Sequence, residues 1–171
     1  GGPTGSLALT RPYHRRMAKT LPRNADLADQ LDLLADLSEI LGEESFKIIA
    51  YRRAAGRIRE TPSSVAELAL EGRAKELPGI GRTIEEKVRE VVEEGEMQAL
   101  KRRRERVPVG VVDFLRLPGV GPKTAARIWT ELGVTTLEGL QAAAADGRLR
   151  ELSGLGVRSE EKILAAFAAR A

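Results

Sequence analysis

The chain has 171 residues and a formal net charge of +3, and 42% of its residues are hydrophobic while 4% are aromatic. That apolar content is enough for one average domain or two small ones, and no apolar run approaches the roughly 18 residues of a membrane-spanning helix. The complete absence of cysteine excludes disulfide bonds, thiolate catalysis and cysteine-bound zinc. These properties predict a cytosolic protein with no membrane partner.

Charge is distributed unevenly along the chain. Residues 26–44 are acidic and contain no lysine or arginine, whereas residues 51–59 contain four arginines and residues 101–107 contain five basic residues and one acid. Such basic runs suit a polyanionic partner, although each run on its own is better explained as a solvated helix face. Only their combination with the glycine-rich turns of the chain favours the polyanion.

Residues 1–23 contain three prolines and no apolar periodicity, which predicts a flexible tail. We expect Met17 to be the native start and residues 1–16 to be upstream sequence that takes no part in the fold. The single histidine, His14, lies in this tail and leaves little scope for imidazole chemistry.

The first two helices are predicted from apolar spacing. Leucines recur at helical intervals from Asp26 to a stop at Gly42, with Asn24 or Asp26 as the cap of the first turn. A second helix is predicted over residues 45–59, with its arginines in solvent. Its expected buried residues are Phe46, Ile49, Ala50, Ala54 and Ile58.

The rest of the chain is also predicted to be helical. Ser64 and Glu67 form a capping box for a short helix over residues 65–70, and Thr135 or Thr136 caps a later helix. Further helices are expected over residues 83–94, 96–106, 111–115, 123–132, 135–149 and 159–169, with a joint between two halves at residues 108–110. No run of alternating β-branched residues is present, so the predicted fold class is all-α.

A glycine-rich turn occurs three times, in the segments ELPGIGRTIEEKV, RLPGVGPKTAARI and ELSGLGVRSEEKI, which begin at residues 76, 116 and 151. Each has two glycines separated by one apolar residue (Ile80, Val120 or Leu155) and is followed by a helix start. Glycine leaves the backbone open to close approach, and the free N–H groups of a helix start bind anions. The pattern predicts a phosphate as the occupant of each turn.

One such turn on its own would be no more than a connection between packed helices. Three copies, with first glycines 40 and then 35 residues apart, make coincidence a poor explanation. The turns neither continue into a P-loop sequence nor follow a strand, which disfavours a nucleotide-binding enzyme and a small-molecule substrate. Three phosphate clamps on a helical scaffold instead predict contacts with successive phosphates of a nucleic-acid backbone, independent of its sequence.

These turns resemble the helix-hairpin-helix motif. The chain resembles the N-terminal region of the family X DNA polymerases in the order of its segments, which is FKIIAYRRAAGRIRE (residues 46–60) followed by the first two turns. The third turn, with its EEKIL ending, is similar to the bacterial branch of that family in particular. The resemblance covers about residues 24–170. It implies two small helical subdomains built around three helix-hairpin-helix motifs, a lyase-like one over residues 24–106 and a DNA-binding one over residues 107–171.

The resemblance implies a function in DNA repair, in the cytoplasm at the bacterial nucleoid. Members of the family hold the 5′-phosphate at a gap or nick in duplex DNA, and in base excision repair a lysine of the first hairpin attacks the sugar left after base loss. Lys87 corresponds to that 5′-deoxyribose-phosphate lyase residue. Its neighbours Glu86 and Glu90 disfavour the neutral amine that the attack requires. Because Arg127 and Lys162 stand at the same offset, a solvated or phosphate-facing lysine is an equally good interpretation.

The resemblance also predicts which residues contact DNA. Thr83 and Ala99 stand where members of the family have lysines and Phe46 replaces a histidine, so the phosphate pocket is expected to be weaker here unless Arg82, Arg52 or Arg53 compensates. Tyr51 either packs between helices or reaches the phosphate, and Trp129 is expected in the core. The predicted DNA- and phosphate-binding residues are Lys47, Tyr51, Arg52, Arg53, Gly79, Gly81, Arg82, Thr83, Gly119, Gly121, Lys123, Thr124, Gly154, Gly156 and Arg158.

A monovalent cation, Na⁺ or K⁺, is a further implication of the resemblance, held by backbone carbonyls of the first two hairpins. The corresponding carbonyls belong to Lys75, Leu77, Ile80, Leu115, Leu117 and Val120. No other cofactor is expected, because the divalent metals of the family belong to polymerase and phosphoesterase domains that would lie beyond Ala171. The acids after Arg116 include no clustered aspartate pair, so the chain is not expected to polymerise DNA by itself.

Two other functions stay open. In the first, the hairpins are a non-enzymatic scaffold for DNA, RNA or a partner protein, and Lys87 has no chemistry. In the second, the chain is a helical RNA-binding or ribosome-associated protein, because phosphate clamps do not distinguish sugars. The oligomeric state is left open as well.

Overall fold

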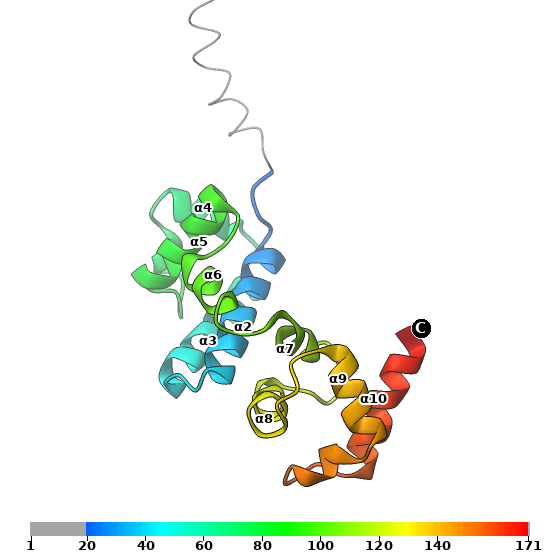
Figure 1. Cartoon of the computed structure of the whole chain (residues 1–171). Coiled ribbons are helices and arrows are strands. Elements are labelled where there is room, and N and C mark those ends of the chain that lie inside the picture. The colour runs from blue at the N-terminus through cyan, green and yellow to red at the C-terminus, as the bar shows by residue number, and fades with distance from the viewer. Residues whose placement is uncertain (1–19, 171) are drawn as a thin grey trace, which may run out of the picture.

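The computed structural model describes residues 20–170, so most of the predicted tail, including Met17 and His14, lies outside the described residues. Between residues 20 and 170 every regular element is a helix, which confirms the all-α class (Figure 1). The elements are α2 (Asn24–Ile40), α3 (Ser45–Glu60), α4 (Val65–Leu70), the 3₁₀ turn η1 (Ala74–Glu76), α5 (Arg82–Glu94), α6 (Gln98–Arg104), α7 (Val109–Phe114), α8 (Pro122–Leu132), α9 (Leu137–Ala145), the 3₁₀ turn η2 (Arg148–Glu151) and α10 (Val157–Arg170). None of these helices combines the length and the apolar character needed to cross a bilayer.

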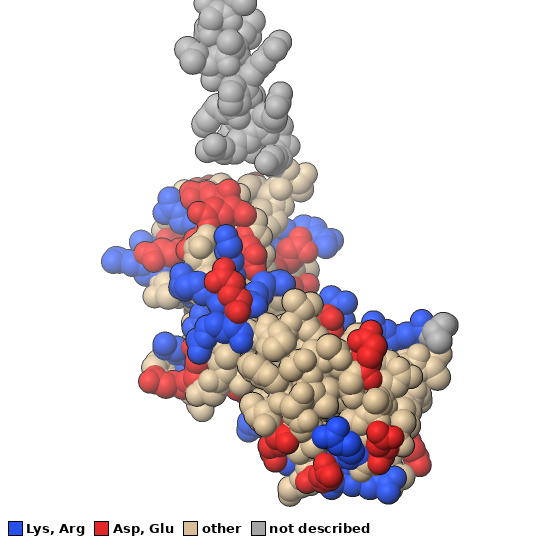
Figure 2. Space-filling view, viewed as in Figure 1, with Lys and Arg blue, Asp and Glu red and all other residues tan. Residues whose placement is uncertain are grey.

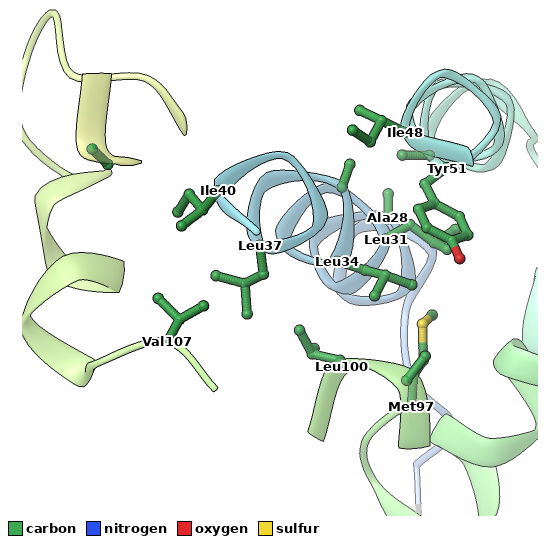
Figure 3. Close-up of a cluster of buried hydrophobic side chains, with 14 of the residues drawn as sticks. Ala28, Leu31, Leu34, Leu37, Ile40, Ile48, Tyr51, Met97, Leu100 and Val107 are labelled. Atoms are coloured by element: carbon green, nitrogen blue, oxygen red, sulfur yellow. The ribbon is translucent and has the colours of Figure 1, made fainter. Parts of the chain in front are cut away.

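Helix α2 lies at the centre of the molecule. Its leucines recur every three or four residues, and those that are completely buried are Leu27, Leu31, Leu34 and Leu37. Figure 3 shows α2 between Tyr51 of α3 and Leu100 of α6. Helix α8 of the C-terminal lobe also packs against α2, so the buried side chains of both lobes form one continuous core. The division of the chain at residue 106 stays a prediction.

The start of α2 differs from the prediction. Arg23 is the N-cap residue, and the Asp26 carboxylate accepts a hydrogen bond from the backbone N–H of Arg23 at 3.3 Å. The Asn24 amide turns away from the helix end, donating to the carbonyl of Thr61 at 2.9 Å and accepting from the N–H of Val65 at the same distance. Asn24 is therefore not the cap, because it fixes the connection between α3 and α4, whereas Asp26 caps the first turn from inside the helix as the acidic member of a capping box.

Helix α3 buries a face that only partly matches the prediction, because Ala54 and Ile58 are buried as expected and the other three residues are not. Phe46 and Ile49 are 66% and 55% exposed, and Ala50 is exposed as well. The buried residues are Ile48, Tyr51, Ala54, Ala55 and Ile58. The helix carries two apolar stripes, and the one that packs is the one that also turns Arg52 and Arg59 toward the carboxylates of α2.

The C-terminal lobe is built from two helix pairs, with α7 and α8 flanking the second glycine turn and α9 and α10 flanking the third. Thr136 caps α9 by accepting a hydrogen bond from the N–H of Gly139 at 3.0 Å, and Ser64 caps α4 in the same way, as predicted. Gly110 lies inside α7, where a Cβ would be 1.9 Å from the carbonyl oxygen of Thr135. The joint predicted at residues 108–110 is thus a close backbone contact between α7 and the start of α9.

Candidate nucleic-acid interface

The three glycine turns share one backbone geometry. The first glycine of each pair is left-handed, with φ of +83° at Gly79, +78° at Gly119 and +85° at Gly154, a conformation that a side chain would strain. The apolar residue that follows points inward: Ile80 is 3% and Val120 is 6% exposed, and Leu155 is half-buried. Each turn is therefore closed and anchored by the same local rule.

Packing within residues 20–170 does not require the second residue of each pair to be glycine. Gly81 and Gly121 are the N-cap residues of α5 and α8 and have extended backbones, which any residue can adopt. A Cβ at Gly81, Gly121 or Gly156 would meet no described atom within 4 Å. The missing side chain thus leaves bare backbone at a helix start, open to an external anion.

The first and third hairpins each contain a buried carboxylate that forms a hydrogen bond within its own hairpin. Glu85 is 4% exposed and accepts a hydrogen bond from the backbone N–H of Lys75 at 2.8 Å. Glu160 is 2% exposed and accepts from the Arg150 guanidinium. Ala125 occupies this position in the second hairpin. This feature was not predicted, although its signal is present in the sequence as a glutamate four residues after the second glycine in two of the three turns.

Lys87 lies half-buried on α5, with its Nζ 5.9 Å from the centre of the Tyr51 ring. Burial is the main cause that lowers the pKa of the Lys87 amine, and the charges of Arg103 and Arg102 lower it further, against the opposing effects of Glu90 and Glu86. The two acids act as predicted. The arginines whose charges oppose these two acids come from α6.

Arg103 is held firmly beside this lysine. Its guanidinium donates to both carboxylate oxygens of Glu43, at 2.8 and 2.7 Å, and to the carbonyl of Ala99 at 2.9 Å. The Arg103 guanidinium in turn lowers the pKa of the Glu43 carboxyl. Figure 2 shows further Lys and Arg side chains gathered over α6, next to a broad uncharged surface over α7, α8 and α9.

The three cations at equal offsets lie in three different environments. Arg127 donates to the Ser153 carbonyl at 2.6 Å and to the Glu131 carboxylate at 2.9 Å, so it links the second hairpin to the third turn. Lys162 is exposed on α10. Only Lys87 of the three lies beside an aromatic ring in the part of the chain that the structure describes.

The other predicted contact residues surround the turns. Most are exposed at the first turn of α5, α8 or α10, as are Arg82, Lys123 and Arg158, and Lys47 is exposed at the start of α3. The Arg52 guanidinium is shared between Asp36 at 3.0 Å and Glu39 at 3.2 Å, unlike its neighbour Arg53. The structure thus brings Tyr51 and Lys87 together and engages Arg52 with α2.

The predicted cation site draws on carbonyls of the hairpin turns. The carbonyl of Leu77 accepts a hydrogen bond from the N–H of Ile80 at 3.0 Å, and that of Leu117 accepts from the N–H of Val120 at 3.2 Å. Each oxygen keeps a second lone pair, so these bonds leave room for a cation. No group of three or more histidine or acidic side chains suited to a metal occurs within residues 20–170.

Comparisons with known proteins match both lobes. A family model described as a helix-hairpin-helix domain matches residues 22–97, and one described as a SAM-like helix-hairpin-helix tandem matches residues 111–169. The chain is 35% identical over 142 residues to the DNA polymerase/3′-5′ exonuclease PolX of Bacillus subtilis (strain 168), which covers 83% of this chain and 24% of that protein. It is 28% identical over 121 residues to DNA polymerase lambda of Rattus norvegicus, covering 71% of this chain and 20% of that protein. The chain therefore spans about a quarter or less of the length of these relatives.

Proposed function

Because the chain belongs to the family X DNA polymerases over its helix-hairpin-helix region, we propose that it binds duplex DNA through the phosphate backbone without reading sequence. The observation that carries the proposal is the bare second glycine, repeated at Gly81, Gly121 and Gly156, which nothing inside the described protein requires. Each glycine stands next to N–H groups of a helix start, which carry partial positive charge. Such groups grip a phosphate whatever base it carries.

The preferred substrate in this proposal is a gap or nick that exposes a 5′-phosphate. Lys47 and Tyr51 on α3 would bind that phosphate, on the side of α3 where Lys87 lies. The Tyr51 ring lies beside Lys87 on α5, the helix that begins at the first turn, which supports a site for the end of a strand next to that turn. A chromosomal substrate of this kind would place the protein at the bacterial nucleoid.

Lys87 is proposed as a 5′-deoxyribose-phosphate lyase nucleophile. The neutral Lys87 amine adds to the C1′ aldehyde of the abasic sugar and releases water, which gives an imine. Loss of a C2′ proton then breaks the C3′–O bond, so that the DNA leaves with its 5′-phosphate, and water hydrolyses the imine and restores the lysine. The lowered pKa of Lys87 supports this role, because attack requires the uncharged amine.

Fluorescence anisotropy with three labelled ligands tests the binding proposal. The ligands are a gapped DNA duplex with a 5′-phosphate, the same duplex without it, and a duplex RNA of equal length. We expect the phosphorylated DNA to bind most tightly and the affinity to fall steeply as salt is raised. Equal affinity for the two DNA ligands would contradict the proposed 5′-phosphate site. An affinity that does not depend on salt would contradict binding through the phosphate backbone. Preference for RNA would favour the RNA-binding alternative.

A further inference from the structure

The four arginines of α3 form two pairs that differ in whether they make ion pairs with α2. Arg52 is paired with Asp36 and Glu39, and Arg59 with Asp32 at 2.6 Å and Asp29 at 2.8 Å, all on α2. Arg53 and Arg57 form no ion pair with any residue between 20 and 170. The carboxylates of α2 pair with Arg52 and Arg59. They therefore do not neutralise the charges of Arg53 and Arg57, which point away from α2.

Arg53 and Arg57 line a groove of about 320 Å³ between α3 and the first glycine turn. Its full lining is Arg52, Arg53, Gly56, Arg57, Glu60, Pro78 and Gly79. The aliphatic stem of Arg53 packs over Gly79, whose Cβ position is 3.5 Å from the Arg53 Cγ. The groove is therefore lined by the guanidinium groups of Arg53 and Arg57, by that of Arg52, which is already paired with α2, and by one carboxylate, and it ends at the exposed backbone of Gly79.

This groove lies on a different face of α3 from the Lys87 site. Arg53 and Arg57 follow Tyr51 by two and six residues, which places them roughly 200° and 240° around the helix axis from it. Tyr51 faces Lys87, whereas Arg53 faces the turn at Gly79. The groove and the proposed 5′-phosphate site are thus separate surfaces that border the same hairpin.

The charge of the groove is not balanced by the described residues that line it. Arg53 and Arg57 are one helical turn apart, a spacing at which like charges repel. Glu60 alone offers a carboxylate in the groove. An anion that enters the groove would relieve this repulsion, and guanidinium groups bind phosphate through paired hydrogen bonds.

We propose that the groove between α3 and the first glycine turn binds a phosphodiester group of a DNA strand, at a contact separate from the one around Lys47, Tyr51 and Lys87. The proposal rests on the proposed binding of DNA. A strand is favoured over an acidic peptide because the groove ends at Gly79, beside the bare backbone of Gly81, so that one strand crossing the turn would place neighbouring phosphates in both.

Substitution of the two unpaired arginines tests this site. Arg53→Gln and Arg57→Gln should each weaken binding to a gapped DNA duplex about three- to tenfold and lower the slope of log K against log salt by about one. The preference for a 5′-phosphate should stay unchanged, because that phosphate binds on the other face. Arg59→Gln is the matched control: it removes the same charge from the same helix, but its guanidinium is already occupied by two carboxylates. Thermal unfolding of all three variants verifies that each is folded.

The outcomes separate this proposal from the function on which it rests. If the wild-type chain binds DNA with a steep salt dependence while Arg53→Gln and Arg57→Gln bind as tightly as Arg59→Gln, the groove is not a DNA contact and only this inference fails. If the wild-type chain does not bind DNA, the proposed function fails first. If Arg53→Gln and Arg57→Gln weaken binding of an oligoglutamate peptide relative to wild type but leave DNA binding unchanged, the groove binds an acidic protein and the phosphodiester site is overturned.

Discussion

The first and second hairpins have the same turn but differ in what surrounds the residue six positions after the second glycine. In the first, Lys87 is half-buried, lies 5.9 Å from the Tyr51 ring and has a lowered pKa. In the second, Arg127 is held by the Ser153 carbonyl and the Glu131 carboxylate, and it joins two hairpins. In the proposed function the turn supplies a general phosphate contact, and the helices packed around it decide whether a nearby cation is available for chemistry.

The largest expected effect is on covalent trapping at the first hairpin. Lys87→Ala should reduce borohydride trapping on a gapped duplex with a 5′-deoxyribose phosphate to below about 1% of wild type, because no other lysine between residues 20 and 170 lies over the Tyr51 ring. Lys162→Ala, at the same offset in the third hairpin, should trap as wild type does. Equal trapping by Lys87→Ala and wild type would mean that Lys87 is not the nucleophile and that the first hairpin, like the second, has no chemical role.

A second difference between the hairpins is the buried carboxylate. Glu85→Ala places in the first hairpin the alanine that the second hairpin has at the equivalent position, Ala125. The substitution leaves the Lys75 N–H without its hydrogen-bond acceptor. We expect a loss of about 1–3 kcal/mol in the free energy of unfolding, measured with denaturant. The exposed neighbour serves as control, since Glu86→Ala should change stability by less than about 0.5 kcal/mol. Identical stabilities would mean that the buried bond contributes nothing.

The shared part of the two turns is tested at their second glycines. Gly81→Ser and Gly121→Ser should each weaken DNA binding about tenfold, since a side chain would stand where the phosphate approaches. Stability should be retained, because serine suits an N-cap and meets no neighbour there. Gly119→Ser, at φ +78°, should instead lower the melting temperature. Tight DNA binding by both N-cap variants would contradict the clamp.

The smallest expected effect concerns the arginines of α6. The charge of Arg102 lowers the pKa of Lys87, so Arg102→Gln should raise that pKa and leave less neutral amine at any pH below it. The pH–rate profile of trapping should therefore move to higher pH, with a rate loss of about two- to tenfold near neutrality. Arg104→Gln is the control, because Arg104 pairs with Glu96. A profile that moves equally in both variants would point to a general charge effect.

The features that the sequence predicted well are local ones. Helix bounds, the caps at Ser64 and Thr136 and the three turns depend on residues a few positions apart, and they were found within a few residues. The inward anchors Ile80 and Val120 follow from the same short pattern. The identity of each turn could thus be predicted without knowing what lies around it.

The features that were missed depend on packing between distant segments. Two apolar stripes of α3 fit the helical period equally well, and packing against α2 selects the one that leaves Phe46 exposed and brings Arg52 to Asp36. The approach of Arg103 to Lys87 likewise joins residues from separate helices, and its pairing with Glu43 spans 60 positions of sequence. Charge runs show that arginines are present, but not which of them remain free.

Gly110 has a consequence for how the second and third hairpins work together. With its Cβ position 1.9 Å from a backbone oxygen at Thr135, this glycine lets the entry helices of the two hairpins touch, and no side chain could be accommodated by a rotamer change alone. The distance between the two proposed clamps is then set by a contact that lies away from both. Gly110 thus acts as a spacer, so a larger residue there would alter which phosphates along a strand the two hairpins can hold at the same time.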